Sequence, residues 1–303
     1  MRNYIFILTH GYKEYLIIKI MLELGRQFRP ETSVVYPPFK KGRYMEEYFY
    51  EYYTKNNIKS DRIYIPIFWT NLQIHAAFSS QKRNYELLLL NALQKMPPTT
   101  KYFTVVQHDD GPQLTLPCDV LVFGACTGNI PLPLIYEDTN NTLEKRKNVQ
   151  NKKYLASFIG SKTHRIRNNI CEINRSDVYI RFQLWTPQVS QNVSELFIEK
   201  TLESKFCLAP RGYGRSSFRF FEAMLLNVVP VYFWDDIEWL PYKDILDYTK
   251  FSVSIQEKDI PRMYDILTSI PNETYVSMIE ELEKVRDYFT LEGMSKYIID
   301  KLA

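Results

Sequence analysis

The chain has 303 residues, of which 45% are hydrophobic and 24% charged, and its formal net charge is +3. This length favours two domains of roughly 150 residues each, and the composition is typical of a globular protein. The charge is too small for a typical nucleic-acid-binding protein, and no run reaches the roughly 18 apolar residues of a membrane span. We therefore expect a soluble cytoplasmic protein with no nucleic-acid partner and no membrane anchor.

The first half of the chain alternates short apolar runs with segments of helical periodicity. Strands are predicted at residues 4–8, 62–68, 102–106 and 119–123. Helices are predicted at residues 14–28, 44–53 and 83–96. This alternation favours a parallel sheet covered by helices, and thus the α/β class.

The alternation pauses at residues 137–153, which are polar and charged, and then restarts. Strands are predicted at residues 154–159, 178–182, 206–209, 228–234 and 250–253. Helices are predicted from His164 and at residues 194–202, 218–226 and 273–302. We expect an N-terminal domain over residues 1–150, a C-terminal domain over 151–280, and a helix at 281–303 that packs back on the first domain.

Open parallel sheets bind ligands at the carboxyl ends of their strands. In the first half, His10 follows the strand at 4–8, and His108 and Asp109 follow the strand at 102–106. Histidine and aspartate at such ends are suited to proton transfer. A purely structural His10, or an aspartate that only caps a turn, is the alternative.

In the second half, a glycine-containing turn joins the strand at 206–209 to the helix at 218–226. Such a turn at a helix N-terminus binds anions, and arginine matches phosphate oxygens. The turn contributes Arg211, Gly212, Arg215, Ser216, Ser217 and Arg219. It lacks the third glycine of a dinucleotide fingerprint, and the chain has no P-loop motif. We therefore expect a site for a phosphate-bearing ligand, with a plain connection as the alternative.

Metal ligation is not expected. The four cysteines have no metal-ligand spacing, and the chain contains no Asp-x-Asp. Asp235 and Asp236, at the end of the strand at 228–234, are more typical of a contact to a donor sugar or a helix cap.

The sequence resembles a known family. Residues 204–241 contain SKFCLAPRGY, then the pattern S-x-R-x-x-E-A, then VPV, two aspartates and Leu-Pro. Outside that stretch, residues 64–68, the His108-Asp109-x-Gly111 turn and residues 158–167 also fit. Together these segments resemble the exostosin-type glycosyltransferases of family 47, over about residues 61–290.

The resemblance implies a GT-B type fold, with two Rossmann-like, doubly wound domains facing a central cleft. It also implies transfer from a nucleotide sugar, usually a uridine diphosphate (UDP) sugar, to a glycan hydroxyl with inversion, and no cofactor or metal. Arg219 and Ser217 would then hold the diphosphate, Glu222 the ribose, and Arg167 would be a second cation. The donor-binding set is Arg167, Arg211, Gly212, Ser216, Ser217, Arg219, Glu222 and Asp235.

Inversion by single displacement needs one base. Asp109 is the first candidate, and His108 and His10 are the others. Asn227 departs from the family pattern, which usually has glycine there. The chain also shows no membrane anchor and no second catalytic domain, and so resembles compact members from large algal viruses or bacteria. That analogy suggests xylose as the donor sugar. A catalytically inactive glycan- or nucleotide-binding protein and a sugar-nucleotide epimerase are the alternatives.

Overall fold

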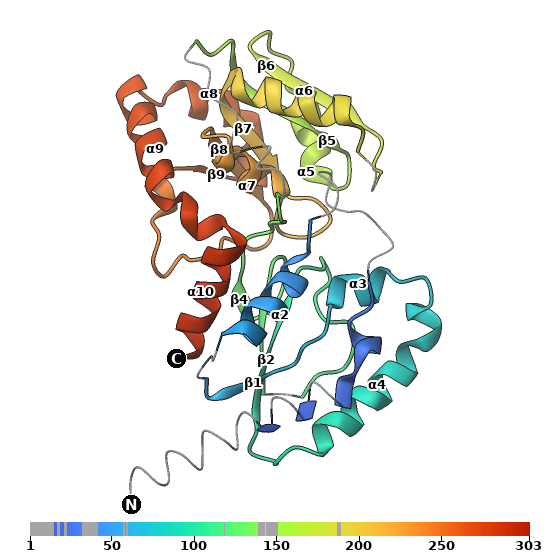
Figure 1. The fold of residues 1–303 in the computed structure, drawn as a ribbon. Coiled ribbons are helices and arrows are strands. Elements are labelled where there is room, and N and C mark those ends of the chain that lie inside the picture. The colour runs from blue at the N-terminus through green and yellow to red at the C-terminus, as the bar shows by residue number, and fades with distance from the viewer. Residues whose placement is uncertain are drawn as a thin grey trace, which may run out of the picture. The chain divides into compact units, whose positions relative to one another are not determined.

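The computed structural model describes residues 15–16, 19–20, 23–31, 42–56, 58, 60–117, 119–138, 143, 151–186 and 189–303 (Figure 1). The chain divides into two compact units, each described by itself below. Unit 1 consists of Met1–Val34, Arg43–Ile130 and Ser295–Ala303, and unit 2 of Val35–Gly42 and Pro131–Met294. The predicted strand at 4–8, the candidate base His10 and most of the polar segment at 137–153 lie outside the described residues. The domain boundaries predicted from the sequence stay predictions.

The first sheet has the strand order β1-β2-β3-β4, and its first three strands belong to unit 1 and run parallel. The strands are β1 (Arg62–Tyr64), β2 (Lys101–Val106), β3 (Val120–Gly124) and β4 (Ile130–Pro131). The strand predicted at 62–68 is too long, because β1 ends at Tyr64. Pro66 has no N–H group with which to continue a ladder.

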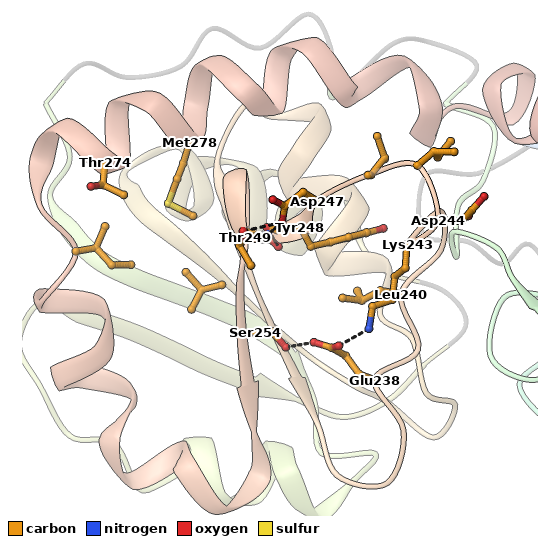
Figure 2. Close-up of a pocket in the computed structure, with 15 residues that line it drawn as sticks. Glu238, Leu240, Lys243, Asp244, Asp247, Tyr248, Thr249, Ser254, Thr274 and Met278 are labelled. Carbon is orange, nitrogen blue, oxygen red and sulfur yellow. Dashed lines mark hydrogen bonds and ion pairs between the residues drawn. The ribbon is translucent and has the colours of Figure 1, made fainter.

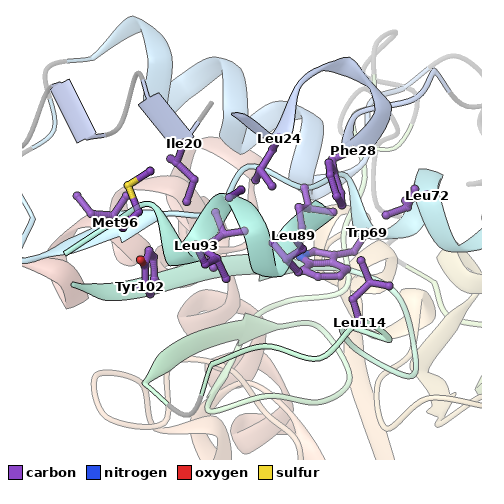
Figure 3. Packing of buried hydrophobic residues seen from close by; sticks show 14 of the residues in the cluster. Ile20, Leu24, Phe28, Trp69, Leu72, Leu89, Leu93, Met96, Tyr102 and Leu114 are labelled. Atoms are coloured by element: carbon purple, nitrogen blue, oxygen red, sulfur yellow. The ribbon is translucent and has the colours of Figure 1, made fainter. Parts of the chain in front are cut away.

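Helices cover both faces of β2. Successive side chains of a strand point to opposite faces, and two neighbouring residues of β2 contact different helices. Tyr102 lies in an apolar cluster with Leu89 and Leu93 of α4 (Phe78–Gln94), as Figure 3 shows. Phe103 stacks on Tyr64, with ring centroids 5.1 Å apart, and contacts Phe49 of α2 (Met45–Lys55). The short helix α3 (Trp69–Ile74) connects β1 to α4.

Unit 2 contains a five-stranded sheet in the order β6-β5-β7-β8-β9, and every neighbouring pair is parallel. Its strands are β5 (Tyr154–Ser161), β6 (Val178–Gln183), β7 (Ser204–Pro210), β8 (Val229–Trp234) and β9 (Val253–Gln256). The last strand begins later than the predicted 250–253. Residues before it form the 3-10 helix η2 (Tyr248–Lys250), which is capped by the Asp247 side chain accepting from the Thr249 N–H.

Alternation along β7 divides the core of unit 2 between two faces. Phe206 and Leu208 pack with residues of α5 (Arg165–Cys171), α8 (Met263–Thr268) and α9 (Asn272–Val285). Cys207 packs on the other face with residues of α6 (Gln191–Leu202) and α7 (Phe218–Leu225). The sheet is therefore doubly wound. Because β5 is first in sequence but lies between β6 and β7, the direction of the connections reverses between β5 and β7, which makes this the switch point.

Two parallel sheets with helices confirm the α/β, two-domain architecture expected of a GT-B type fold. The cleft expected between the domains stays a prediction. The single helix predicted at 273–302 is wrong, because it breaks after α9 into η4 (Arg286–Phe289) and α10 (Leu291–Leu302). At the break, Thr290 is extended and Phe289 is buried. The remaining 3-10 helices are η1 (Arg26–Phe28) and η3 (Glu257–Arg262).

Candidate functional site

The strand ends at the switch point of unit 2 are held together by one guanidinium group. Nη1 of Arg167, on α5, donates to the carbonyl of Ser161 at the end of β5 (2.9 Å). Nη2 donates to the carbonyl of Pro210 at the end of β7 (3.2 Å), and Nε donates to that of Arg211 (3.1 Å). Arg167 thus supplies a positive charge where ligands bind in such sheets, and it also fixes the two strand ends.

The predicted glycine turn follows β7 directly. The Gly212 N–H donates to the Ser216 carbonyl (3.3 Å), and a Cβ at Gly212 would lie 3.1 Å from Nη2 of Arg167. Ser217 is the N-cap residue of α7, but its side chain makes no capping hydrogen bond. The Ser217 hydroxyl and Nε of Arg211 are buried without a hydrogen-bond partner. Both are donors close to a helix N-terminus, so the turn retains hydrogen-bonding capacity for an anion.

Carboxylates at the end of β8 lie among the arginines of this turn. Nη1 of Arg211 is 2.6 Å from Asp235 and 2.9 Å from Asp236, and Nη2 of Arg215 is 2.7 Å from Asp236. Burial acts to raise the pKa of Asp236, but the Arg215 and Arg211 guanidinium groups hold it well below its usual range. Asp235 therefore lies beside the turn, as predicted, but as the partner of an arginine.

The same ion pairs continue to α5. Arg165 is 3.2 Å from Asp235 and 2.8 Å from Glu257. Three arginines and three carboxylates are thus linked, and we call Arg165, Arg211, Arg215, Asp235, Asp236 and Glu257 the β8-end network. His164, the N-cap of α5, has Nε2 3.6 Å from Asp235. Burial and the nearby Arg211 lower the pKa of His164, which disfavours its protonated form.

A second buried group lies in the first turns of α7. Arg219 donates to the Ile159 carbonyl (2.9 Å), pairs with Glu222, and lies 4.0 Å from the centre of the Phe197 ring. The other carboxylate oxygen of Glu222 accepts from the Tyr136 hydroxyl (2.9 Å). Burial acts to lower the pKa of Arg219, but the Glu222 carboxylate raises it above its ordinary value. Arg219, the candidate for the diphosphate contact, and Glu222, the candidate for the ribose contact, therefore form an ion pair with each other.

Unit 1 places His108 and Asp109 in a tight turn after β2. The Gly111 N–H donates to the His108 carbonyl (2.9 Å), and Gly111 has a φ of 69°, which favours glycine. Nδ1 of His108 accepts from the Asp110 N–H (3.2 Å), which assigns the proton of the neutral ring to Nε2. Burial lowers the pKa of His108, although Asp109 and Asp110 act in the opposite direction.

The Asp109 carboxylate is half-buried and is held by a thiol. Its Oδ1 accepts from Sγ of Cys126, which is buried and free of disulfide bonds (3.2 Å). The turn as a whole is positioned by neighbouring side chains rather than by strand pairing. The role of residues 108–111 as a catalytic loop stays a prediction.

Three further residues near these sites were not predicted. Tyr136 lies in an irregular segment and gave no sequence signal, and His164 was assigned to a plain helix. Glu46, on α2, is fully buried and belongs to no sequence motif. It lies on the same buried face of the helix as Phe49 and Tyr53, which follow it at i+3 and i+7. An acidic residue on an apolar helical face is a signal that sequence reading can detect.

Unit 2 also has a pocket of about 770 Å³ between residues 238–249, β9 and α9 (Figure 2). Glu238 lies on its wall and bonds both Lys243 and the Ser254 hydroxyl, while Met278 contributes an apolar surface. None of the predicted donor-binding residues lines this pocket. The pocket and the glycine turn are therefore separate features of the unit.

No group of three or more His, Cys, Asp or Glu side chains in the described part of the chain could hold a metal ion. Among the helices formed by the same residues, none combines the length and apolar character needed to cross a membrane.

Part of the chain is similar to a known protein family. Residues 126–270, just under half of the chain, match the sequence profile of the Exostosin GT47 domain. The resemblance predicted from the sequence is thus confirmed, and the exostosin GT47 segment contains the whole glycine turn and the β8-end network.

Several plant proteins are similar to the chain over part of this segment. A probable glycosyltransferase of Arabidopsis thaliana is 35% identical over 100 residues, covering 33% of this chain and 21% of that protein. The probable beta-1,4-xylosyltransferase IRX10 of the same plant is 36% identical over 85 residues (28% and 20%). The probable glucuronosyltransferase GUT1 of Oryza sativa subsp. japonica is 35% identical over 85 residues (28% and 20%).

These matches span about a fifth of the length of each relative. Among solved structures, WaaG, a glycosyltransferase involved in lipopolysaccharide biosynthesis, overlaps at a TM-score of 0.35 and 11% identity, covering 80% of this chain and 75% of that one. The fold assignment rests on the two parallel sheets themselves.

Proposed function

We propose that the chain is an inverting glycosyltransferase that moves a sugar from a UDP-sugar to a hydroxyl group of a glycan acceptor. The observation that carries the proposal is the glycine turn at the switch point of the unit 2 sheet. There the Ser217 hydroxyl and Nε of Arg211 are buried donors without partners, next to a helix N-terminus. Diphosphate oxygens are the acceptors that such donors lack.

In the proposed donor site, Arg219 and Ser217 bind the diphosphate and Arg167 adds positive charge. Glu222 accepts hydrogen bonds from the ribose hydroxyls, which requires the Tyr136 hydroxyl to give up its bond to that carboxylate. Asp235 contacts the sugar. The cations and the helix N-terminus offset the charge that grows on the leaving diphosphate, so the proposal needs no metal.

In the proposed chemical step, the base removes the proton of the acceptor hydroxyl as its oxygen attacks the anomeric carbon. The bond from that carbon to the diphosphate oxygen breaks, its electron pair leaves with UDP, and the sugar is inverted. Asp109 is the preferred base. His108 is less suited, because its Nδ1 lone pair accepts the Asp110 N–H and its Nε2 carries the proton. His10 stays an alternative.

The donor sugar is proposed to be xylose, and the similarity to IRX10, a probable beta-1,4-xylosyltransferase, supports a xylosyl donor. The similarity to GUT1, a probable glucuronosyltransferase, supports glucuronic acid equally. Thermal stabilisation by a panel of nucleotides and UDP-sugars distinguishes these donors, because a ligand at 100 times its Kd adds about 2.7 kcal/mol of stability.

The decisive experiment measures transfer and UDP binding in the same variants. We expect D109N to lower transfer by about 100- to 10,000-fold while leaving UDP affinity unchanged. R219A should abolish UDP binding, and R219K serves as its control, because R219A also leaves the buried Glu222 without its cation. Transfer at the wild-type rate by D109N would exclude Asp109 as the base.

Other products identify the alternatives. UDP binding without transfer to any acceptor would indicate an inactive binding protein, and a free isomer of the sugar nucleotide would indicate an epimerase. Transfer that is lost on treatment with EDTA would contradict the metal-independent step.

A further inference from the structure

A buried carboxylate lies directly before the loop that carries His108 and Asp109. Glu46 is in the first turn of α2 and is fully buried. Its Oε1 accepts hydrogen bonds from the N–H (3.2 Å) and the hydroxyl (2.8 Å) of Thr70, and from the N–H of Gln107 (2.9 Å). One oxygen atom therefore joins α2, the start of α3 and the end of β2.

The other oxygen of this carboxylate is buried without a hydrogen-bond partner. Burial raises the pKa of Glu46 to about 6, and the hydrogen bonds from Gln107 and Thr70 reduce that rise. A buried carboxylate without a cation is costly, and an apolar side chain of the same size would pack there at no such cost. A group kept at such a cost beside a candidate catalytic loop is a candidate for a functional role.

Gln107 forms a second hydrogen bond between the end of β2 and α2, in which Gln107 is the acceptor. Its side-chain oxygen accepts the N–H of Met45 (3.0 Å), so that α2 and the end of β2 are joined twice. The next residue along the chain is His108. Any displacement of Gln107 is therefore passed directly to the two side chains that follow it.

The far end of the loop is fixed by the same short helix. Gln73 of α3 donates to the Gly111 carbonyl (3.0 Å) and accepts from the Gln113 N–H (2.8 Å). Since Thr70 of α3 bonds to Glu46, which in turn bonds to Gln107, the same helix is linked to both ends of residues 108–110. The loop thus has support on each side that does not depend on strand pairing.

We propose that Glu46 is the positioning residue of the His108–Asp109 loop and acts through the Gln107 N–H. It fixes the direction in which β2 delivers the Asp109 carboxylate, and it does not itself contact substrate. The inference rests on the proposed function, in which Asp109 is the base. A misplacement of about 1 Å in a catalytic group can cost about 100-fold in rate.

Three variants separate positioning from packing. E46L removes the acceptor oxygen but keeps the side-chain size, whereas E46Q keeps an amide oxygen that can accept the same hydrogen bonds. F49L is the matched control, because Phe49 is fully buried on the same face of α2 and packs on Tyr64 and Phe103 rather than on the loop. Each variant is measured for kcat, donor KM, Tm and amide hydrogen exchange of residues 107–111.

We expect E46L to lower kcat by 10- to 100-fold, with donor KM unchanged, and to speed exchange in residues 107–111. E46Q should restore kcat to within about 3-fold of the wild type, and F49L should lower Tm through lost packing with little change in kcat. Equal kcat losses in E46L and F49L would overturn the proposal.

The exchange measurement keeps this inference separate from the proposed function. If D109N retains full activity, the assignment of the base fails, but faster exchange in E46L and not in F49L still supports the positioning role of Glu46. Unchanged exchange of residues 107–111 in E46L overturns the positioning role whatever D109N does.

Discussion

Replacing Glu46 by glutamine should raise the stability of unit 1 relative to the wild type, and this difference should be larger at neutral pH than at acidic pH. Burial raises the pKa of Glu46 from 4.5 to about 6, a difference of about 1.5 units. At 1.36 kcal/mol per unit, this difference corresponds to about 2 kcal/mol. Glutamine carries no titrating proton, so the E46Q protein lacks this contribution at every pH.

The sign follows from the direction of the shift. Because the folded pKa is the higher one, the stability linked to the neutral acid is fully present below about pH 4.5 and is lost as pH rises through about 6. The wild type should therefore lose about 2 kcal/mol relative to E46Q between pH 4 and pH 7. Tyr64, on β1, stays neutral throughout, since burial and Glu46 raise its pKa well above the usual value. His108 titrates in both proteins and cancels.

The assay is hydrogen exchange of the β2 amides in both proteins at a series of pH values. Intrinsic exchange rates cancel at each pH, so the ratio of protection factors reports the difference in unfolding free energy of unit 1. That ratio should change by about 30-fold between pH 4 and pH 7. Amides of β7 in unit 2 are the internal control. A ratio that stays constant over this range would refute the raised pKa and the cost assigned to the buried carboxylate.

Three further substitutions test the sites. S217A should leave stability unchanged, because the hydroxyl has no partner, yet weaken UDP binding about 5-fold by calorimetry; a loss of stability would contradict the unpartnered hydroxyl. D236N removes a carboxylate that holds Arg211 and Arg215, so UDP affinity should rise a few-fold, and a decrease would show that Asp236 supports the site. G111A places a Cβ 2.5 Å from Thr127 at a φ of 69°, so urea denaturation should show a loss of more than about 1 kcal/mol.

The strand–turn–helix of the proposed donor site could be predicted from the sequence because all its signals are local. A continuous apolar run gives β7, the glycines give the turn, and Ser217 begins α7 within the same 20 residues. The predicted donor residues all come from unit 2, around the strand ends expected to bind ligands. What the sequence did not reveal is that Arg211 and Arg219 are paired with carboxylates of the chain itself.

Contacts between distant residues account for the rest. Glu46 accepts hydrogen bonds from Thr70 and Gln107, which are 24 and 61 residues away, so no local pattern indicates its surroundings. Tyr136 reaches Glu222 across 86 residues. The late start of β9 has a local cause, since Asp247 caps the turn at η2 before the strand begins.

The β8-end network contains as many guanidinium groups as carboxylates, so it has no net charge of its own. Long-range attraction of anions depends on net charge, and a balanced group of this kind exerts little pull beyond contact distance. We therefore expect the network itself to add little to the ionic-strength dependence of diphosphate association, in contrast to Arg167. An inorganic phosphate ion, which offers no base or ribose, should compete poorly because it must separate existing ion pairs with few contacts in return. Selectivity at this edge of the sheet then comes from exchange of partners rather than from accumulated positive charge.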